Sequence, residues 1–384
     1  MSTISLCMIV KNEELTLARC LNSCKKLFDE IIIVDTGSHD KTKQIARKYT
    51  NQIYDFKWQN DFSLARNYAF SKATSEYIMW LDADDVVPKN SLKELLKLKP
   101  LLNADVYMLK YNIAFCNNKP TFSYYRERIV KNCAKALWQG VVHECITPFG
   151  EIKRLSIAIN HKKIKYEKSD RNIKIYRQLI KKRPLTPREQ YYYGRELYDH
   201  KKYYKSISVL KKFVLSGKGW HENVCDAIYI ISECYRQIND TKKQLTWLLK
   251  SFEFAVPRAN IACKIADNFL CAKNYNLAIF WYDLATKCED VTLLGGFVEP
   301  MYYNYYPYLQ MCYCYFCLGD LSTSEKYNNL AKKYYRSEQV INNEKYFNSL
   351  KNKNSVANAT QMKNENWWIN DEYTHKYELS QTLH

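Results

Sequence analysis

Short apolar runs alternate with stretches of helical periodicity in the first third of the chain. The apolar runs are 4–10, 30–34 and 77–81, and the helical stretches are 14–26, 41–49, 63–73 and one that begins at Ser91. Strands that alternate with helices build a mostly parallel sheet covered by helices, so the pattern predicts an α/β fold with a doubly wound sheet. Ligands bind to such sheets at the carboxyl ends of the strands.

Acidic residues follow two of these runs at the point where each predicted strand ends. Asp35 closes the second run, and Asp82-Ala83-Asp84 follows the third, with Asp85 next. Because the carboxyl ends of parallel strands meet at one edge of a sheet, we expect these carboxylates along one edge. Carboxylate oxygens suit hard divalent cations, which in turn bind diphosphates. A solvated acidic turn is the alternative for the triplet taken alone.

From Arg171 onward the strand pattern gives way to pairs of amphipathic helices. Four similar segments carry small or polar residues at equivalent positions, namely Ser206, Gln244, Ala278 and Ser324. These positions are 38, 34 and 46 residues apart, and tetratricopeptide (TPR) helix pairs repeat with a period of roughly 34 residues. We therefore predict a sheet domain over residues 1–170, an all-α TPR-like domain over 171–350 and a polar tail over 351–384.

The chain carries a formal net charge of +18 at pH 7. A basic surface suits phosphate-bearing ligands and membrane headgroups, although lysine-rich helix faces that aid solubility explain the charge equally well. No DNA- or RNA-binding motif accompanies it, so nucleic-acid binding ranks last among the function classes. We expect no nucleic-acid partner.

The fourteen cysteines lie mostly singly within apolar segments, which is typical of buried thiols. The tightest group, Cys312, Cys314 and Cys317, lacks a second Cys/His pair at zinc spacing. The apolar stretch 4–10 has no basic flank before it, which indicates a strand rather than a signal peptide. No apolar run reaches the ~20 residues that span a bilayer. We expect a cytoplasmic protein with reduced thiols and no membrane span.

Several motifs follow one another in an order that resembles the family 2 glycosyltransferases of the GT-A fold, in the branch with a C-terminal helical-repeat domain. The matching segments are 7–14, 29–42, 58–67, 80–85, 126–130 and 138–144. The resemblance covers about residues 1–170, and the repeats more loosely. The chain is also similar to transferases that glycosylate bacteriocin-type peptides. These likenesses imply a GT-A, Rossmann-like sheet and an inverting hexosyltransferase that uses a UDP-sugar, with glucose or GlcNAc as the sugar.

The resemblance implies a metal-dependent reaction at the D-x-D motif. Mg²⁺ or Mn²⁺ would neutralise the departing diphosphate as a Lewis acid. Asp84 is the expected direct ligand of the metal, and Asp82 would contact the ribose or the metal. His161 follows the apolar run 155–159 and matches a histidine that the family carries downstream. It would complete the metal shell, unless it is a structural histidine.

Four further residues belong to the donor side in this interpretation. The resemblance implies that Asp35 recognises the nucleotide base, and that Asn12 and Glu13, after the first predicted strand, line the nucleotide pocket. Arg66 would hold a phosphate or orient an aspartate with its guanidinium group. A salt bridge on a helix surface is the alternative for Arg66.

An inverting transfer also needs a base that takes the proton of the acceptor. His143 and Glu144 are both candidates, and Gly140 before them permits a close approach of the backbone to a substrate. Neighbouring residues of a strand point to opposite faces, so only one of the two is expected to face the sugar. The chain departs from the family pattern at Asp85, where many members have glutamate, and at residues 145–146.

The helical region suggests how an acceptor is selected. Stacked helix pairs create concave surfaces suited to peptides, so we expect residues 188–340 to capture a protein or peptide acceptor. A cell-surface glycan or a lipid-linked acceptor is an alternative, and such repeats also mediate homodimers. In the other function class, the chain is a non-catalytic TPR scaffold with a degenerate transferase domain.

Overall fold

The computed structural model describes residues 2–116, 119–164, 169–289, 291 and 299–352. The chain divides into two compact units, Met1–Tyr192 and Tyr193–His384. The predicted tail over 351–384 lies outside the described residues from position 353 onward. The predicted limits of the domains remain predictions.

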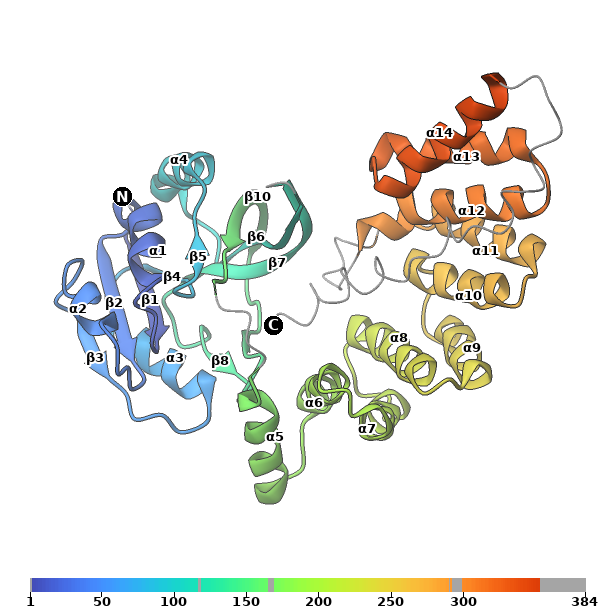
Figure 1. The fold of residues 1–384 in the computed structure, drawn as a ribbon. Coiled ribbons are helices and arrows are strands. Elements are labelled where there is room, and N and C mark those ends of the chain that lie inside the picture. Colours follow the sequence, from blue (N-terminus) through green and yellow to red (C-terminus); the bar gives the residue numbers. More distant parts are fainter. Residues whose placement is uncertain (1, 117–118, 165–168, 290, 292–298, 353–384) are drawn as a thin grey trace. The chain divides into compact units, whose positions relative to one another are not determined.

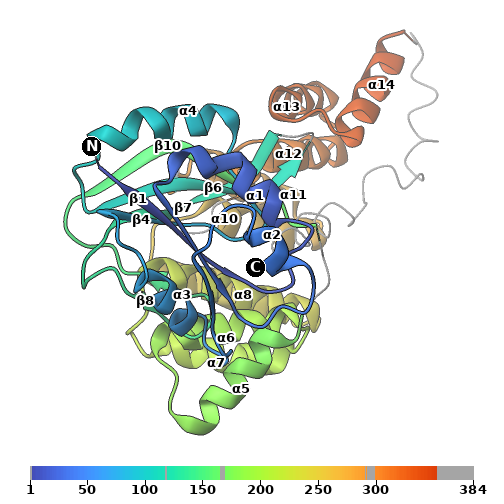
Figure 2. The ribbon, with the colours of Figure 1, turned by 90° about the vertical axis from the view of Figure 1, so that its left-hand side faces the viewer.

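An eight-stranded sheet forms the centre of the first unit, with the strand order β3-β2-β1-β4-β7-β6-β10-β5 (Figures 1 and 2). Its strands are β1 Ile4–Val10, β2 Glu30–Asp35, β3 Ile53–Asp55, β4 Tyr77–Trp80, β5 Asp85–Val86, β6 Val106–Cys116, β7 Lys119–Lys131 and β10 Ile152–His161. The strands β3, β2, β1 and β4 are parallel to one another, and β10 is parallel to β6. The predicted α/β fold with a mostly parallel sheet is confirmed.

Three pairings in the second half of the sheet are antiparallel. Strand β7 lies between β4 and β6 and is antiparallel to both, so β6 and β7 form a long hairpin that the sequence pattern did not predict. The short strand β5 pairs antiparallel with the end of β10. A separate small sheet joins β8, Trp138–Gln139, to β9, Cys145–Ile146.

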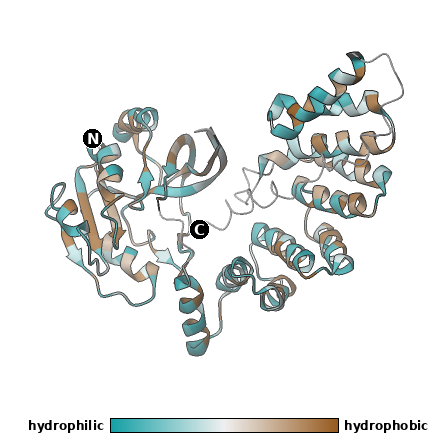
Figure 3. Cartoon of the chain, in the orientation of Figure 1, coloured by the Kyte–Doolittle hydropathy of each residue, from teal (hydrophilic) through white to brown (hydrophobic). Residues whose placement is uncertain are grey.

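Helices cover both faces of the large sheet. They are α1 Leu17–Cys24, α2 Thr42–Ala46, α3 Phe62–Phe70 and α4 Lys89–Leu98, with 3₁₀ turns η1 Lys25–Leu27 and η2 Lys99–Leu101. Strand β1 shows how the faces divide: Leu6 and Met8 pack in one buried cluster with α1 and α4, and Cys7 packs in another with α3. This alternation follows the two-residue period of a strand. Figure 3 shows apolar residues along the central strands.

Among the described residues after the sheet, every regular element is a helix or a 3₁₀ turn. They are α5 Arg171–Lys182, α6 Pro187–Asp199, α7 Tyr203–Leu215, α8 His221–Gln237, α9 Thr241–Lys250, α10 Ala259–Cys271, α11 Tyr275–Lys287, α12 Tyr305–Cys317, α13 Leu321–Tyr334 and α14 Glu338–Asn352, with 3₁₀ turns η3 Ser251–Glu253 and η5 Pro300–Tyr303. From α7 to α14 each helix packs against the next one (Figure 1). No helix among the described residues combines the length and the apolar character that crossing a membrane requires.

The second unit repeats its local contacts. The hydroxyl of Ser206 donates to the carbonyl of Gly194 at 2.8 Å, and the hydroxyl of Ser324 donates to that of Cys312 at 2.7 Å. Both bonds join consecutive helices over the same sequence separation. The helices α9, α11 and α13 also share a cap, because the side chains of Asp240, Asn274 and Asp320 each accept a backbone N–H of the first turn. These repeated contacts support the predicted TPR-like architecture.

Candidate active site

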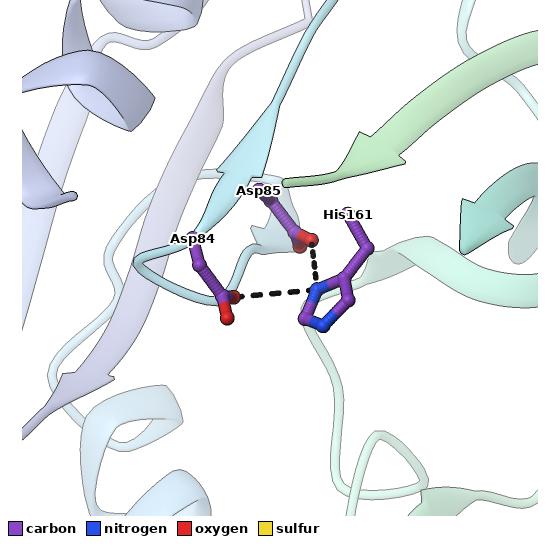
Figure 4. A group of neighbouring side chains, drawn as sticks. All are labelled: Asp84, Asp85 and His161. Atoms are coloured by element: carbon purple, nitrogen blue, oxygen red, sulfur yellow. Dashed lines mark ion pairs between the residues drawn. The ribbon is translucent and has the colours of Figure 1, made fainter. Parts of the chain in front are cut away.

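Two carboxylates and one imidazole meet at the carboxyl edge of the sheet. Strand β4 ends at Trp80, the D-x-D motif follows, and β5 begins at Asp85, which lies opposite His161 in the pairing of β5 with β10. The Nδ1 atom of His161 is 3.4 Å from Oδ1 of Asp84 and 3.5 Å from Oδ1 of Asp85 (Figure 4). One ligand atom from each of the three residues lies within 4.8 Å of the others.

This Asp-Asp-His group has the chemistry of a site for a hard divalent cation. Oxygen donors with one imidazole suit Mg²⁺ and Mn²⁺. Burial lowers the pKa of His161, but hydrogen bonds to Asp84 and Asp85 outweigh burial and raise that pKa to about 10. The two carboxylates therefore favour a positive charge at this position. A protonated His161 supplies that charge, and a bound cation would supply it as well.

Asp85, one of the two acids of this group, is held in place by hydrogen bonds to both of its carboxylate oxygens. Its Oδ2 atom accepts from Arg128 at 3.0 Å and from the amide of Asp82 at 3.0 Å, and its Oδ1 accepts from the hydroxyl of Tyr111 at 2.8 Å. The side chains of Asp85 and Arg128 are both fully buried. The guanidinium lies 3.8 Å from the ring centroid of Trp80 and 4.2 Å from that of Tyr111. This paired, buried charge fixes the backbone of the D-x-D loop.

Arg66 on α3 joins two carboxylates. Its Nε donates to Glu144 at 2.6 Å and its Nη2 to Asp82 at 2.8 Å. The guanidinium also lies over the rings of Trp80 and Trp138, at 5.0 and 4.6 Å from their centroids, in cation–π contact. Arg66 is buried, so it forms no surface salt bridge. Of the two expected roles, orienting an aspartate is the one that these contacts display.

Asp82 faces Arg66 rather than the Asp-Asp-His group. Burial would raise the pKa of Asp82, but the guanidinium charges of Arg66 and Arg128 lower it to about 2. The structure therefore brings Asp84 and His161 together as expected, adds Asp85, and gives Asp82 a separate partner.

Asp35 ends β2 on the same edge of the sheet. Its Oδ1 accepts the amides of Gly37 and Ser38 at 2.9 Å each, whereas its Oδ2 is buried without a hydrogen-bond partner among the described residues. Strand β1 lies between β2 and β4, so Asp35 and the D-x-D motif are separated by two strand spacings, roughly 10 Å. Asp35 lies outside the reach of the Asp-Asp-His group and leaves one acceptor atom for a ligand.

Asn12 and Glu13 lie beside Asp35, because β1 and β2 are neighbours. The amide of Asn12 donates to Ser38 and its Oδ1 accepts from the amide of His39, both at 2.9 Å. The amide of Glu13 donates to the hydroxyl of Thr42 at 2.7 Å. The loop after β1 is thus tied to the loop after β2 at the edge of the sheet.

His143 and Glu144 lie in the loop between β8 and β9 rather than in a strand, and their side chains have different partners. The carboxylate of Glu144 accepts from Arg66, which places it one guanidinium away from Asp82. The ring of His143 stacks on Tyr192, with centroids 4.4 Å apart and an interplanar angle of 15°. Glu144 is therefore connected to the D-x-D loop, and His143 is packed against α6.

Two residues of the site, Tyr111 and Arg128, were not predicted, and Asp85 was expected at this edge of the sheet without a role as a ligand. Arg126 and Arg128 form part of a segment that resembles the family, and both guanidinium groups lie over the ring of Trp80. Their spacing of two residues on a strand places them on one face, which was the available signal. Tyr111 gives no such signal, because only the pairing of β6 with β10 brings it to His161.

The chain is similar to several known proteins. Residues 5–157 match the model of the family described as Glycosyl transferase family 2. The SPbeta prophage-derived glycosyltransferase SunS of Bacillus subtilis is 30% identical over 288 residues, which cover 70% of this chain and 66% of that protein. A TPR repeat-containing protein of Synechococcus elongatus is 44% identical over 95 residues, 25% of this chain and 24% of that protein.

Among solved structures, Staphylococcus aureus TarS 1–349 covers 65% of this chain and 91% of its own at 15% identity and a TM-score of 0.37. The match to SunS spans 66% of the length of that protein. The matched region includes the D-x-D motif and Arg66, and helices follow it. Residues 5–157 thus form a domain that matches glycosyl transferase family 2, and a helical domain follows the sheet.

Proposed function

We propose that the chain is an inverting, metal-dependent glycosyltransferase that moves a sugar from a UDP-sugar to an acceptor. The observation that carries this proposal is the Asp-Asp-His group at the carboxyl edge of the sheet, the edge at which β2 ends in Asp35 with a carboxylate oxygen that has no partner among the described residues. One position suits a cation beside a diphosphate, and the other suits the N–H group of a nucleotide base.

Asp84 and His161 would hold Mg²⁺ or Mn²⁺, with Oδ1 of Asp85 as the third donor atom. When bound, such an ion stabilises negative charge on a leaving diphosphate. Nη2 of Arg66 donates to Oδ1 of Asp82 at 2.8 Å. The remaining lone pairs of the Asp82 carboxylate would accept a hydrogen bond from a ribose hydroxyl. Asn12, Glu13 and Asp35 would line the nucleotide side.

Glu144 is our candidate for the base. Its carboxylate reaches the D-x-D loop through Arg66, whereas the ring of His143 stacks on Tyr192. In an inverting displacement, Glu144 accepts the proton of the acceptor hydroxyl or thiol while that atom bonds to the anomeric carbon and the bond to the diphosphate breaks. Replacing Glu144 with glutamine should stop transfer, whereas H143N, which removes the other candidate base, should retain part of it.

The acceptor is a protein or peptide side chain in this proposal. Helix-pair repeats present extended surfaces that suit chain-like ligands, and α7 to α14 form such a series. The resemblance to bacteriocin-peptide transferases supports the same class. Glucose or GlcNAc is the proposed sugar.

The test is incubation of the full chain with a panel of UDP- and GDP-sugars and Mn²⁺, followed by measurement of the free nucleoside diphosphate. A transferase releases UDP slowly even with water as the acceptor, and D84A should abolish that release. The scaffold alternative predicts no release from any donor and no thermal shift with UDP and Mn²⁺, and that result would overturn the proposal.

A further inference from the structure

Four consecutive main-chain carbonyls of the loop between β8 and β9 each accept a hydrogen bond from a different element. The donors, in the order of the carbonyls of residues 141–144, are the amide of Phe62 on α3 at 3.0 Å, the hydroxyl of Tyr176 on α5 at 3.4 Å, Nη2 of Arg188 on α6 at 3.0 Å and Nη2 of Arg126 on β7 at 3.3 Å. A loop that is fixed at successive residues presents its side chains in one geometry.

The backbone of His143 is the unusual part of this loop. Its φ of 53° lies in the left-handed region, which residues with a side chain adopt sparingly. Two residues of α6 hold it there: Arg188 binds the carbonyl of His143, and Tyr192 stacks on its ring. The guanidinium of Arg188 also lies 4.8 Å from the ring centroid of Tyr192. A backbone conformation that its surroundings fix in this way is a frequent feature of functional sites.

The turn at His143 makes the side chains of His143 and Glu144 point to different elements. The His143 ring faces α6, and the next side chain, Glu144, faces Arg66 on α3. If the loop relaxed at His143, the carboxylate of Glu144 would leave its 2.6 Å contact with Arg66, because adjacent side chains follow the backbone. Both Arg188 and Tyr192 lie after residue 157, where the family match ends.

We propose that Arg188 and Tyr192 are positioning residues, which hold the His143 backbone so that the carboxylate of Glu144 stays at Arg66. Helix α6, which lies after the matched domain, thus helps to position Glu144, the candidate base of that domain. The inference rests on the proposed function in its choice of Glu144 as the base. The geometric part, that α6 fixes the loop, stands on its own.

Hydrogen exchange of the full chain tests the geometric part without any activity. In R188M, backbone amides of residues 138–147 should exchange about tenfold faster than in the wild type, since a hydrogen bond from a charged group is lost. R188K should restore slow exchange in part. The matched control is R195M, because Arg195 is on the same helix and donates instead to Asp226 at 2.7 Å. Y192A, which removes the stacked ring, is the second variant.

Release of UDP from UDP-glucose with Mn²⁺ tests the functional part. We expect kcat to fall about tenfold in R188M with KM unchanged within about twofold, and R195M to match the wild type. Unchanged exchange in both R188M and Y192A would overturn the inference, as would equal effects of R188M and R195M. A wild-type chain that releases UDP from no donor would defeat the proposed function, and the exchange experiment would still decide whether α6 fixes the loop.

Discussion

Nδ1 of His161 lies 3.4 Å from Oδ1 of Asp84, although Asp84 lies in the loop after β4 and His161 is the last residue of β10. They meet because β5 begins directly after Asp84 and pairs antiparallel with β10, which places Asp85 opposite His161. The register of one short strand therefore decides which donors gather at this edge. It also explains why Asp85, rather than Asp82, is the second acid of the group.

Replacement of Asp84 tests the group directly. We expect D84A to retain its fold, because this side chain belongs to neither buried cluster of the sheet, and to release UDP at least about 100-fold more slowly, because a cation ligand is lost. Thermal melting and UDP release measure the two effects. D55A is the matched control, since Asp55 also ends a strand but pairs with Lys43. A fully active D84A would contradict the mechanism.

Removal of divalent ions tests the cation itself. Wild-type protein treated with EDTA should lose UDP release, and excess Mn²⁺ or Mg²⁺ should restore it, because carboxylate oxygens bind both ions. The same treatment should leave the thermal midpoint of D84A unchanged. Undiminished release in EDTA would exclude a metal-dependent reaction.

The ion pair of Asp85 with Arg128 should be far more important for stability than an exposed pair. Both side chains are fully buried, so R128M removes the guanidinium partner of a buried carboxylate, which costs about 3–5 kcal/mol in unfolding free energy. K43M removes the partner of Asp55 at the surface and should cost at most about 1 kcal/mol. Urea unfolding of the two variants measures both values, and equal losses would show that the buried pair has no special role.

Strands β1, β2 and β4 were predictable because their signals are local, whereas the short strand β3 of the same parallel half was not predicted. Each apolar run with an acid at its end shows both a strand and a position at the carboxyl edge, as Asp35 and Asp84 illustrate. The hairpin of β6 and β7 escaped prediction, because β7 carries Arg126, Glu127 and Arg128 within a strand and its partners are distant in sequence. Pairing across the sheet buries those charges against one another and against Trp80.

The candidate site was predictable residue by residue, but its partnerships were not. The resemblance suggested Asp84, His161 and Glu144, yet it could not show that Arg66 would donate to two carboxylates at once. Side-chain partners across α3, β4 and the loop after β8 depend on tertiary packing, which sequence spacing does not record. The same limit applies to Arg188, whose contact with His143 depends on how α6 folds back.

A carboxylate in the helical unit offers a pH test that does not involve the active site. Oδ1 of Asp267 on α10 accepts from the hydroxyls of Tyr282 at 2.6 Å and Tyr306 at 2.9 Å, and Oδ2 lies 3.8 Å from Nζ of Lys264. Burial raises the pKa of Asp267, and the charge of Glu233 adds to it. These two effects exceed the lowering by Lys264 and the two tyrosines.

The sign of the effect follows from this raised pKa. The folded unit binds the Asp267 proton more tightly than the unfolded chain does, so the stabilisation from this group is complete below the unfolded pKa of about 3.9 and is lost as pH rises through the folded pKa. D267N keeps an acceptor oxygen for the tyrosines but carries no charge. Its unfolding free energy relative to wild type should therefore rise between pH 4 and pH 7. Urea unfolding of D267N and wild type across this pH range measures the difference, and a flat difference for D267N would contradict the assignment of the burial effect to Asp267.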